Sequence, residues 1–186
     1  MSKHSTEDQL RTMIAECKAG KRKAQHQFFK LFYGTTMAIC MRYAKDREEA
    51  EDMLNEGFLK VFTQLEKYEE SGSFDAWFKK VIINTAIDYQ RKYKTLTPTT
   101  SFDDLPEISI TSTTENEALA KISTDELLAL IQQLPPTSRS VFNLYVFEEY
   151  PHAEIARMLD MKEGTSHWHL NFARNKLKEM ILERNH

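Results

Sequence analysis

Hydrophobic residues in this chain recur every three or four positions over long stretches, which is the spacing of one face of an α-helix. The longest such stretch, residues 46–94, predicts two long helices joined by a Gly-containing loop at 69–73, with the second helix spanning 74–94. Phe58 and Val61 are typical of the buried face of the first helix. Strand-like alternation is rare, so the pattern predicts an all-α fold.

Shorter periodic stretches predict the remaining helices. In chain order they span residues 6–19, 24–33, 35–43, 115–133, 137–148, 151–160 and 164–184. Thr6 is a candidate N-cap of the first of these, with Gln9 at capping-box spacing. The last two, with a short turn at 160–163 between them, predict a helix-turn-helix, whose second helix conventionally enters the DNA major groove.

The segment between the two groups of helices has a different composition. Its first part contains few apolar residues, no helical period and a run of Ser and Thr. Lys121 is the only basic residue of the stretch 95–133, against seven acidic ones. The sequence therefore predicts two small helical domains, residues 1–94 and 122–186, joined by a flexible acidic linker at 95–121.

Composition excludes several classes of function. The net charge of −3 predicts weak nonspecific DNA binding by the chain alone, since that binding needs many Lys and Arg on phosphates. Cys17 and Cys40 are the only cysteines, so neither a disulfide framework nor a thiolate zinc site is expected. The Glu-x-x-His spacing from Glu149 to His152 spans Pro151 at a helix boundary and would not hold ligands on one face. We therefore expect no metal, no cofactor and no enzymatic activity.

The chain carries no sign of a membrane segment. Its N-terminus is polar, and no run of eighteen apolar residues occurs in the sequence. We expect no membrane insertion and a cytoplasmic localisation.

Two surfaces of the long helices are candidate binding faces. In the first helix, Asp52, Asn55, Glu56 and Leu59 share one outward face at helical spacing, which suits a partner protein, although a merely solvated face has the same pattern. The second helix carries a polar stripe that is a nucleic-acid candidate. The stripe consists of Lys80, Asn84, Asp88, Arg91 and Lys92.

The last helix is predicted to present a second nucleic-acid candidate. Ser166, Leu170, Ala173 and Leu177 are predicted to face inward, and Thr165, Trp168, Asn171, Phe172 and Asn175 to point outward. Two outward aromatic side chains need an explanation, because exposed apolar surface forgoes burial. Contact with thymine methyl groups, a covering partner protein, and packing against the linker or the chain end are the three alternatives.

Short runs in both predicted domains resemble one known family. The first domain resembles region two of bacterial RNA polymerase sigma factors of the extracytoplasmic-function (ECF) group, in the runs DREEAEDMLNEGF (46–58), GSFDAW (72–77) and NTAIDY (84–89). The second domain is similar to their region four, in the runs LPP (134–136), VF (141–142), EIA (154–156), EGT (163–165) and AR (173–174). Two sets of runs in this order across a linker are specific.

The resemblance implies roles for these surfaces. The first long helix would dock on the clamp helices of the large subunit of core RNA polymerase through Asp52, Asn55, Glu56, Phe58 and Leu59. The loop at 68–73 and the second helix would recognise the minus-ten promoter element as single strand, with Tyr68 and Phe74 lining a pocket for an extruded base. The minus-ten residues would be Tyr68, Ser73, Phe74, Lys80, Asn84, Asp88, Arg91 and Lys92.

The second domain would read the minus-thirty-five element as duplex. The implied residues are Arg139, Thr165, His167, Trp168, Asn171, Phe172, Arg174, Asn175 and Lys178, with Arg139, Arg174 and Lys178 available to phosphates. The chain departs from the family's usual Lys, Arg or Ser at His167, Trp168, His169 and Phe172, and from its Gly at Asp160. Promoter sequence therefore cannot be carried over, and His protonation is expected to make this domain's DNA binding depend on pH.

The resemblance implies a transcription initiation factor with three kinds of partner: core RNA polymerase, promoter DNA and an anti-sigma factor. The acidic linker, with Asp103, Asp104 and Glu107, would thread the nucleic-acid channels of the polymerase and affect initiation or promoter escape. Two alternatives stay open. One is a helix-turn-helix regulator that acts without polymerase, and the other is a protein-only adaptor, which Trp168 and Phe172 favour.

Overall fold

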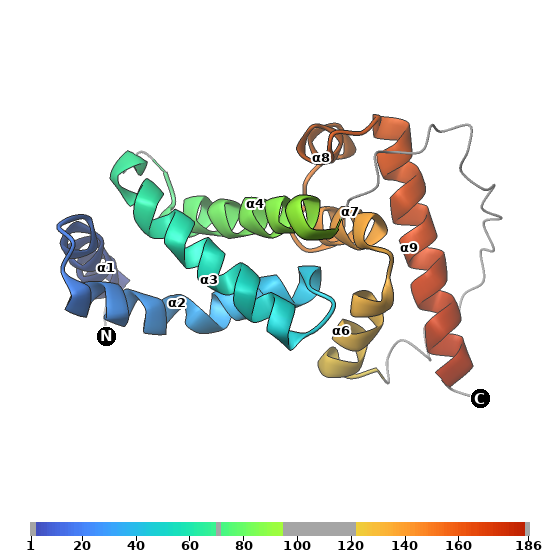
Figure 1. Ribbon diagram of the computed structural model, residues 1–186, viewed down its shortest axis with the longest axis horizontal. Helices are drawn as coiled ribbons and strands as arrows, with labels where there is room; N and C mark the ends of the chain where they lie inside the picture. Colours follow the sequence, from blue (N-terminus) through green and yellow to red (C-terminus); the bar gives the residue numbers. More distant parts are fainter. Residues whose placement is uncertain (1–2, 70–71, 95–121, 185–186) are drawn as a thin grey trace. The chain divides into compact units, whose positions relative to one another are not determined.

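The computed structural model describes residues 3–69, 72–94 and 122–184, and within them every regular element is a helix (Figure 1). The elements are α1 (Lys3–Lys18), α2 (Arg22–Tyr43), α3 (Arg47–Gln64), the 3-10 helix η1 (Leu65–Lys67), α4 (Phe74–Lys94), α6 (Thr124–Gln133), α7 (Pro136–Val146), α8 (His152–Leu159) and α9 (Glu163–Arg184). The predicted all-α fold is confirmed. The predicted linker, including Asp103, Asp104 and Glu107, lies outside the described residues.

Contacts divide the chain into two compact units, which are described separately. The first consists of Met1–Cys40 and Arg47–Ala86, and the second of Met41–Asp46 and Ile87–His186. The predicted domain boundaries at 94 and 122 fall at the edges of the undescribed segment, so they stay a prediction.

An aromatic cluster forms the core of the first unit. Phe28 of α2 is fully buried, and its ring lies 6.4 Å from that of Phe58 and 5.9 Å from those of Phe74 and Phe78 (centroid to centroid). The Phe74 and Phe58 contacts are edge-on, a favoured geometry for aromatic pairs. These contacts join α2 to both α3 and α4. The cluster therefore fixes which faces of α3 and α4 remain exposed.

Two small predictions about the first unit were wrong. The sequence pattern predicted a break between residues 33 and 35, but α2 continues through Gly34, where a Cβ would meet no atom within 4 Å. Glycine inside a helix costs about 1 kcal/mol relative to Ala, which the buried side chains of α2 offset. Helix α1 begins at Lys3, so Thr6 lies inside the helix and is not its N-cap.

Helix α6, the first helix after residue 121, has a well-defined N-cap. The Ser123 side chain accepts from the Glu126 backbone N–H and the Glu126 carboxylate accepts from the Ser123 N–H, which is a capping box at the start of α6. The Arg139 guanidinium donates to the carbonyls of Gln132 (2.6 Å) and Leu134 (2.9 Å). These bonds fasten the turn between α6 and α7.

Helices α8 and α9 form the predicted helix-turn-helix. The turn starts at Asp160, which is in the left-handed conformation (φ 53°, ψ 53°), and the Met161 N–H donates to the Ala156 carbonyl. A left-handed residue at this place explains why the family pattern has Gly there. The predicted inner face of α9 is confirmed: Ser166, Leu170, Ala173 and Leu177 are all buried.

The aromatic cluster generates a stability prediction. Replacing Phe28 by Ala removes a ring in contact with five other rings and leaves a cavity, so we expect a loss of about 3–5 kcal/mol in the free energy of unfolding. Urea denaturation of the full chain, followed by circular dichroism, measures this loss.

The matched control lies one turn away on the same helix. The Leu31 side chain is 59 % exposed, so Leu31→Ala should change stability by less than about 0.5 kcal/mol. Equal losses for the two variants would contradict the assignment of Phe28 to the centre of the core.

Candidate functional site

The outer face of α3 presents a leucine among polar groups. Leu59 is 64 % exposed, Asp52 and Asn55 are exposed, and Glu56 is half-buried. Phe58 does not belong to this face, because it is only 3 % exposed and its ring packs 4.5 Å from that of Phe29. The predicted partner-binding role of Phe58 is therefore corrected to a core role.

The predicted polar stripe on α4 lies on the surface. Lys80, Asn84, Asp88 and Arg91 are exposed and recur at intervals of three or four residues, and Lys92, which follows Arg91 directly, is exposed as well. The opposite side of the helix is anchored in the core. The stripe can therefore meet an extended ligand along several turns of α4.

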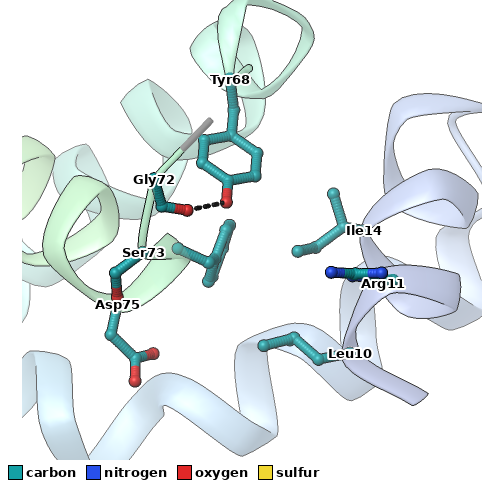
Figure 2. Close-up of a pocket in the computed structure, with 8 residues that line it drawn as sticks. Leu10, Arg11, Ile14, Tyr68, Gly72, Ser73 and Asp75 are labelled. Carbon is teal, nitrogen blue, oxygen red and sulfur yellow. Dashed lines mark hydrogen bonds between the residues drawn. The ribbon is translucent and has the colours of Figure 1, made fainter. Parts of the chain in front are cut away.

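A pocket of about 340 Å³ lies beside the start of α4, within the first unit (Figure 2). One wall comes from α1, and the other comes from the residue after η1 and from the first residues of α4 with the loop before them. Its lining residues are Leu10, Arg11, Ile14, Tyr68, Gly72, Ser73, Phe74 and Asp75. Tyr68, Ser73 and Phe74 were predicted as minus-ten residues, and the structure brings them together here.

Hydrogen bonds and ring contacts hold Tyr68 in the pocket wall. Its hydroxyl donates to the Gly72 carbonyl at 2.9 Å, and its ring lies edge-on to Phe74, with centroids 5.2 Å apart. The Trp77 ring lies 5.2 Å from Tyr68 on a further side. The Lys18 ammonium donates to the Tyr68 backbone carbonyl at 3.1 Å and so ties α1 to this wall.

The α1 side of the pocket was not predicted from the sequence. In the sequence, Leu10 and Ile14 carry only the apolar spacing of a helix, and Arg11 has no signal that distinguishes it from other surface cations. Asp75 was part of a quoted run but carried no predicted role. A pocket between residues that are about sixty positions apart could not be found from local spacing.

Two residues predicted to contact minus-thirty-five DNA are buried. Thr165 is 1 % exposed, because it lies on the inner side of α9 next to Ser166. Arg139 is 4 % exposed, and its guanidinium is already bonded to backbone carbonyls. Neither side chain is available to DNA in this structure, so both assignments are corrected.

The remaining predicted residues of α9 are at least partly accessible. His167, Asn171 and Arg174 are exposed, and Asn175 and Lys178 are half-buried. Trp168 and Phe172 are also half-buried and stack on each other, with centroids 5.2 Å apart and planes 14° from parallel. Each ring thus covers part of the other, which accounts for some of the apolar surface that the sequence left unexplained.

Two histidines, His152 and His167, stack on each other near the start of α9. The His152 Nδ1 lies 2.9 Å from the Ser166 Oγ, and its ring stacks on that of His167 at 3.7 Å. Burial lowers the pKa of His152, and the charges of His167 and Arg174 lower it further against the opposing effect of Glu163. His152 is therefore held neutral at pH 7.

His169 lies on another side of α9. Its Nδ1 is 2.9 Å from the Ser138 Oγ of α7. Burial lowers the pKa of His169 to about 4. The predicted pH dependence near neutrality therefore does not come from His169, because this side chain takes up a proton only in acid.

The described residues 3–69, 72–94 and 122–184 contain no cluster of three or more His, Cys, Asp or Glu side chains that could hold a metal ion. Within the same residues, no helix combines the length and the apolar character needed to cross a membrane.

Comparison with known families gives two matches. Residues 28–95 match the family model of Sigma-70 region 2, and residues 124–177 match that of Sigma-70 region 4. The two matches are in the same order as the runs that resembled these regions in the sequence. They cover the exposed faces of α3 and α4 and the helix-turn-helix.

Full-length relatives agree with these matches. The ECF RNA polymerase sigma factor SigM of Bacillus subtilis (strain 168) is 25% identical over 154 residues, which is 83% of this chain and 93% of the relative. SigW of the same strain is 23% identical over 183 residues, covering 92% and 96%. The RNA polymerase sigma-E factor of Streptomyces coelicolor (strain ATCC BAA-471 / A3(2) / M145) is 29% identical over 143 residues, 77% of each chain.

One solved structure has a similar fold. It is the sigma factor RpoE of Bartonella quintana, crystallised with the anti-sigma factor NepR. The TM-score is 0.52 at 17% identity, and the match covers 85% of this chain and 96% of RpoE.

The buried His169 generates a pH prediction. Its folded-state pKa of about 4 is below the value near 6.5 expected in the unfolded chain, so the unfolded state binds a proton first as the pH falls. His169 therefore favours folding fully above about pH 6.5, and this contribution is lost between there and about pH 4. We expect His169→Asn to reduce the difference in unfolding free energy between pH 7 and pH 5 by roughly 1–2 kcal/mol, measured by urea denaturation.

The control for this measurement is His26→Asn, since His26 is exposed on α2. It should leave the difference between the two pH values as in the unmodified chain. If His169→Asn left the difference in unfolding free energy between pH 7 and pH 5 unchanged, that result would contradict the burial effect.

Proposed function

Because the chain belongs to the extracytoplasmic-function group of bacterial RNA polymerase sigma factors, we propose that its three exposed surfaces divide the work of promoter-specific initiation. The outer face of α3 binds core RNA polymerase, the pocket with the α4 stripe binds the melted minus-ten strand, and α9 binds the duplex minus-thirty-five element. The observation that carries the proposal is the base-sized pocket on the helix that also bears the exposed polar stripe.

The polymerase face consists of Asp52, Asn55, Glu56 and Leu59. Leu59 supports this assignment because burying an exposed Leu at an interface is worth about 1.5–3 kcal/mol, which a solvated face forgoes. The surrounding polar groups give a rim that can select a complementary surface. Phe58 supports the face from below through its core packing.

The minus-ten surface suits a single strand better than a duplex. Aromatic side chains next to a groove provide stacking for unpaired bases, worth about 1–3 kcal/mol each. Tyr68, which is half-buried, supplies such a ring beside the pocket, and Lys80 and Lys92 supply positive charge for phosphates along α4. Phe74 also lines the pocket but is only 7 % exposed, and the Arg91 guanidinium donates to the Met158 backbone carbonyl, so neither carries this step. The pocket offers a place for one extruded base, whose removal from the stack costs a few kcal/mol.

In the second unit, α9 is the helix that enters the major groove. His167, Asn171 and Arg174 are its exposed polar side chains, and the stacked pair Trp168 and Phe172 offers apolar contact to thymine methyl groups. Thr165 and Arg139 act in support of this surface rather than on DNA, because both are buried.

Other expectations for this chain follow from its family. A sigma factor works by directing another enzyme, so we infer no catalytic activity of its own and a place of action in the cytoplasm. RpoE of Bartonella quintana is bound to an anti-sigma factor in its solved structure, and we infer a partner of that kind for this chain too. Family membership sets aside a polymerase-independent regulator and a protein-only adaptor.

The polymerase face is tested by placing a charge at its apolar centre. Leu59→Asp should weaken binding to core RNA polymerase by ten-fold or more, because the exposed leucine would be replaced by a group that is costly to desolvate. Binding is measured by titrating labelled chain with core enzyme, and specific transcription should fall in parallel.

Leu31→Asp is the matched control, since Leu31 is also an exposed leucine but lies on α2. Its affinity for core enzyme should stay within two-fold of the unmodified chain. If both variants lose affinity equally, the partner face is wrongly placed on α3.

The α4 stripe is tested by separating polymerase binding from promoter opening. Asn84→Ala should leave core binding unchanged and slow the formation of open complexes on duplex promoters by about ten-fold, because a group facing the strand is lost. Permanganate footprinting of unpaired thymines measures the opening.

Lys79→Ala is the control on the same helix, since Lys79 is exposed but is turned about 100° from Lys80. It should open promoters like the unmodified chain. Normal opening by Asn84→Ala would remove Asn84 from the minus-ten surface.

A further inference from the structure

We propose that α1 completes the minus-ten pocket and that Arg11 selects an extruded base with two adjacent hydrogen-bond acceptors, which is guanine or cytosine. The inference rests on the proposed function, since it assumes that the pocket receives a promoter base. It adds a specificity-determining residue outside the part of the chain that matches Sigma-70 region 2, which begins at residue 28.

The pocket needs α1 as a wall. Leu10, Arg11 and Ile14 line one side, and Figure 2 shows Arg11 and Asp75 on opposite sides with the Tyr68 ring above them. Leu10 is half-buried and contributes apolar surface that a flat base can cover, and the buried Phe74 and Ile14 line the pocket from the core side. The volume of about 340 Å³ is at the lower end of the range for small-ligand pockets, which suits one base.

Helix α1 is fixed against the rest of the unit. Ile14 and Cys17 are 5 % and 4 % exposed, so the inner stripe of α1 is packed in the core. Lys18 donates to the Tyr68 carbonyl at 3.1 Å, and its ammonium also lies 5.8 Å from the centre of the Tyr68 ring. These contacts fix the position of α1 along its axis. Arg11 is seven residues before Lys18 and therefore lies two turns away on the same helix.

The polar groups of the pocket are available to a ligand. Arg11 and Asp75 are both exposed, and among the described residues neither side chain makes an ion pair or a hydrogen bond. A cation and an anion on opposite walls can therefore each meet a different edge of the same base. Ser73 adds a hydroxyl to the same side of the lining as Asp75, and this hydroxyl already accepts from the Ala76 N–H at 3.4 Å.

The chemistry of the two walls restricts the base. A guanidinium presents parallel N–H groups that bind two adjacent acceptors, such as O6 and N7 of guanine or O2 and N3 of cytosine. Adenine and thymine carry no such pair, because neither has two acceptors that are adjacent on one edge. The Asp75 carboxylate accepts from an amino group, which guanine carries on another edge and cytosine carries beside N3, on the edge that holds its acceptor pair.

The test uses holoenzyme assembled from core polymerase and the full chain. Its DNA is a set of promoters melted in advance over the minus-ten element, with each of the four bases at every non-template position. The unmodified holoenzyme should prefer guanine or cytosine at one position, on the order of ten-fold or more over adenine and thymine. Arg11→Ala should abolish that preference and leave the preferences at the other positions intact.

Two further variants separate the effect of the two parallel guanidinium donors from the effect of the positive charge. Arg11→Lys keeps the positive charge but lacks the two parallel donors, so it should also lose the preference. Arg22→Ala is the matched control, because Arg22 is an exposed arginine at the start of α2 and does not line the pocket. Circular dichroism verifies that all three variants fold.

Base analogues identify whether guanine or cytosine supplies the two acceptors that Arg11 binds. If guanine is preferred, 7-deazaguanine removes N7 and should lower binding of the unmodified holoenzyme to the level of Arg11→Ala. If cytosine is preferred, 3-deazacytosine removes N3 and should lower binding of the unmodified holoenzyme to the level of Arg11→Ala. Either result supports the inference and identifies the base.

Three results would overturn the inference. A loss in Arg11→Ala that is equal for all four bases would make Arg11 a phosphate contact, as would rescue by Arg11→Lys. A preference for adenine or thymine at the Arg11-dependent position would contradict the acceptor pair. Arg11 variants that behave like Arg22→Ala, with Asn84→Ala still defective in opening, would defeat this inference alone, whereas a normal Asn84→Ala would defeat the proposed function as well.

Discussion

Packing of aromatic rings around Phe28 is the constraint on which the surfaces of the first unit depend. The ring contacts Phe58 on α3 and Phe74 and Phe78 on α4, and it is fully buried. Because large rings interdigitate in only a few ways, this cluster sets the rotation of α3 and α4 about their axes. Gly57 allows α3 to pack closely against α4, because a Cβ at this position would lie 2.9 Å from the Cδ1 of Ile82 on α4. The Leu59 face and the Lys80 stripe are exposed as a consequence of that packing.

Helical periodicity predicted most of the fold, because long amphipathic stretches leave little freedom in where a helix lies. Helix α4 begins at Phe74 as predicted, and α9 begins one residue before the predicted position. The break at Gly34 was predicted wrongly, because a glycine signal is local whereas the packing of α2 on both sides of it is not. The sequence pattern therefore predicted where these helices begin better than it predicted the interruption at Gly34.

The candidate sites were predicted less completely, for two physical reasons. A residue at the edge of a helical face can turn inward or outward with a small rotation, so Thr165 was assigned to the surface although it is buried. Helical spacing correctly placed Phe58 in the core, and only the family resemblance implied a docking role for it. An arginine near a turn can bind backbone carbonyls as readily as phosphates, and Arg139 does the former. Arg11 could not be found, because its significance depends on Asp75 and Tyr68, which only the tertiary fold brings near it.

The bond from Lys18 to Tyr68 has a consequence for how such a pocket can change. Lys18 binds the backbone carbonyl of residue 68, an atom that every amino acid carries. Substituting the ring at that position would alter what the cavity accepts and would keep the acceptor that tethers α1. The tether of α1 thus depends on a backbone atom, whereas the bond to Gly72 and the contacts with Phe74 and Trp77 depend on the side chain of the same residue.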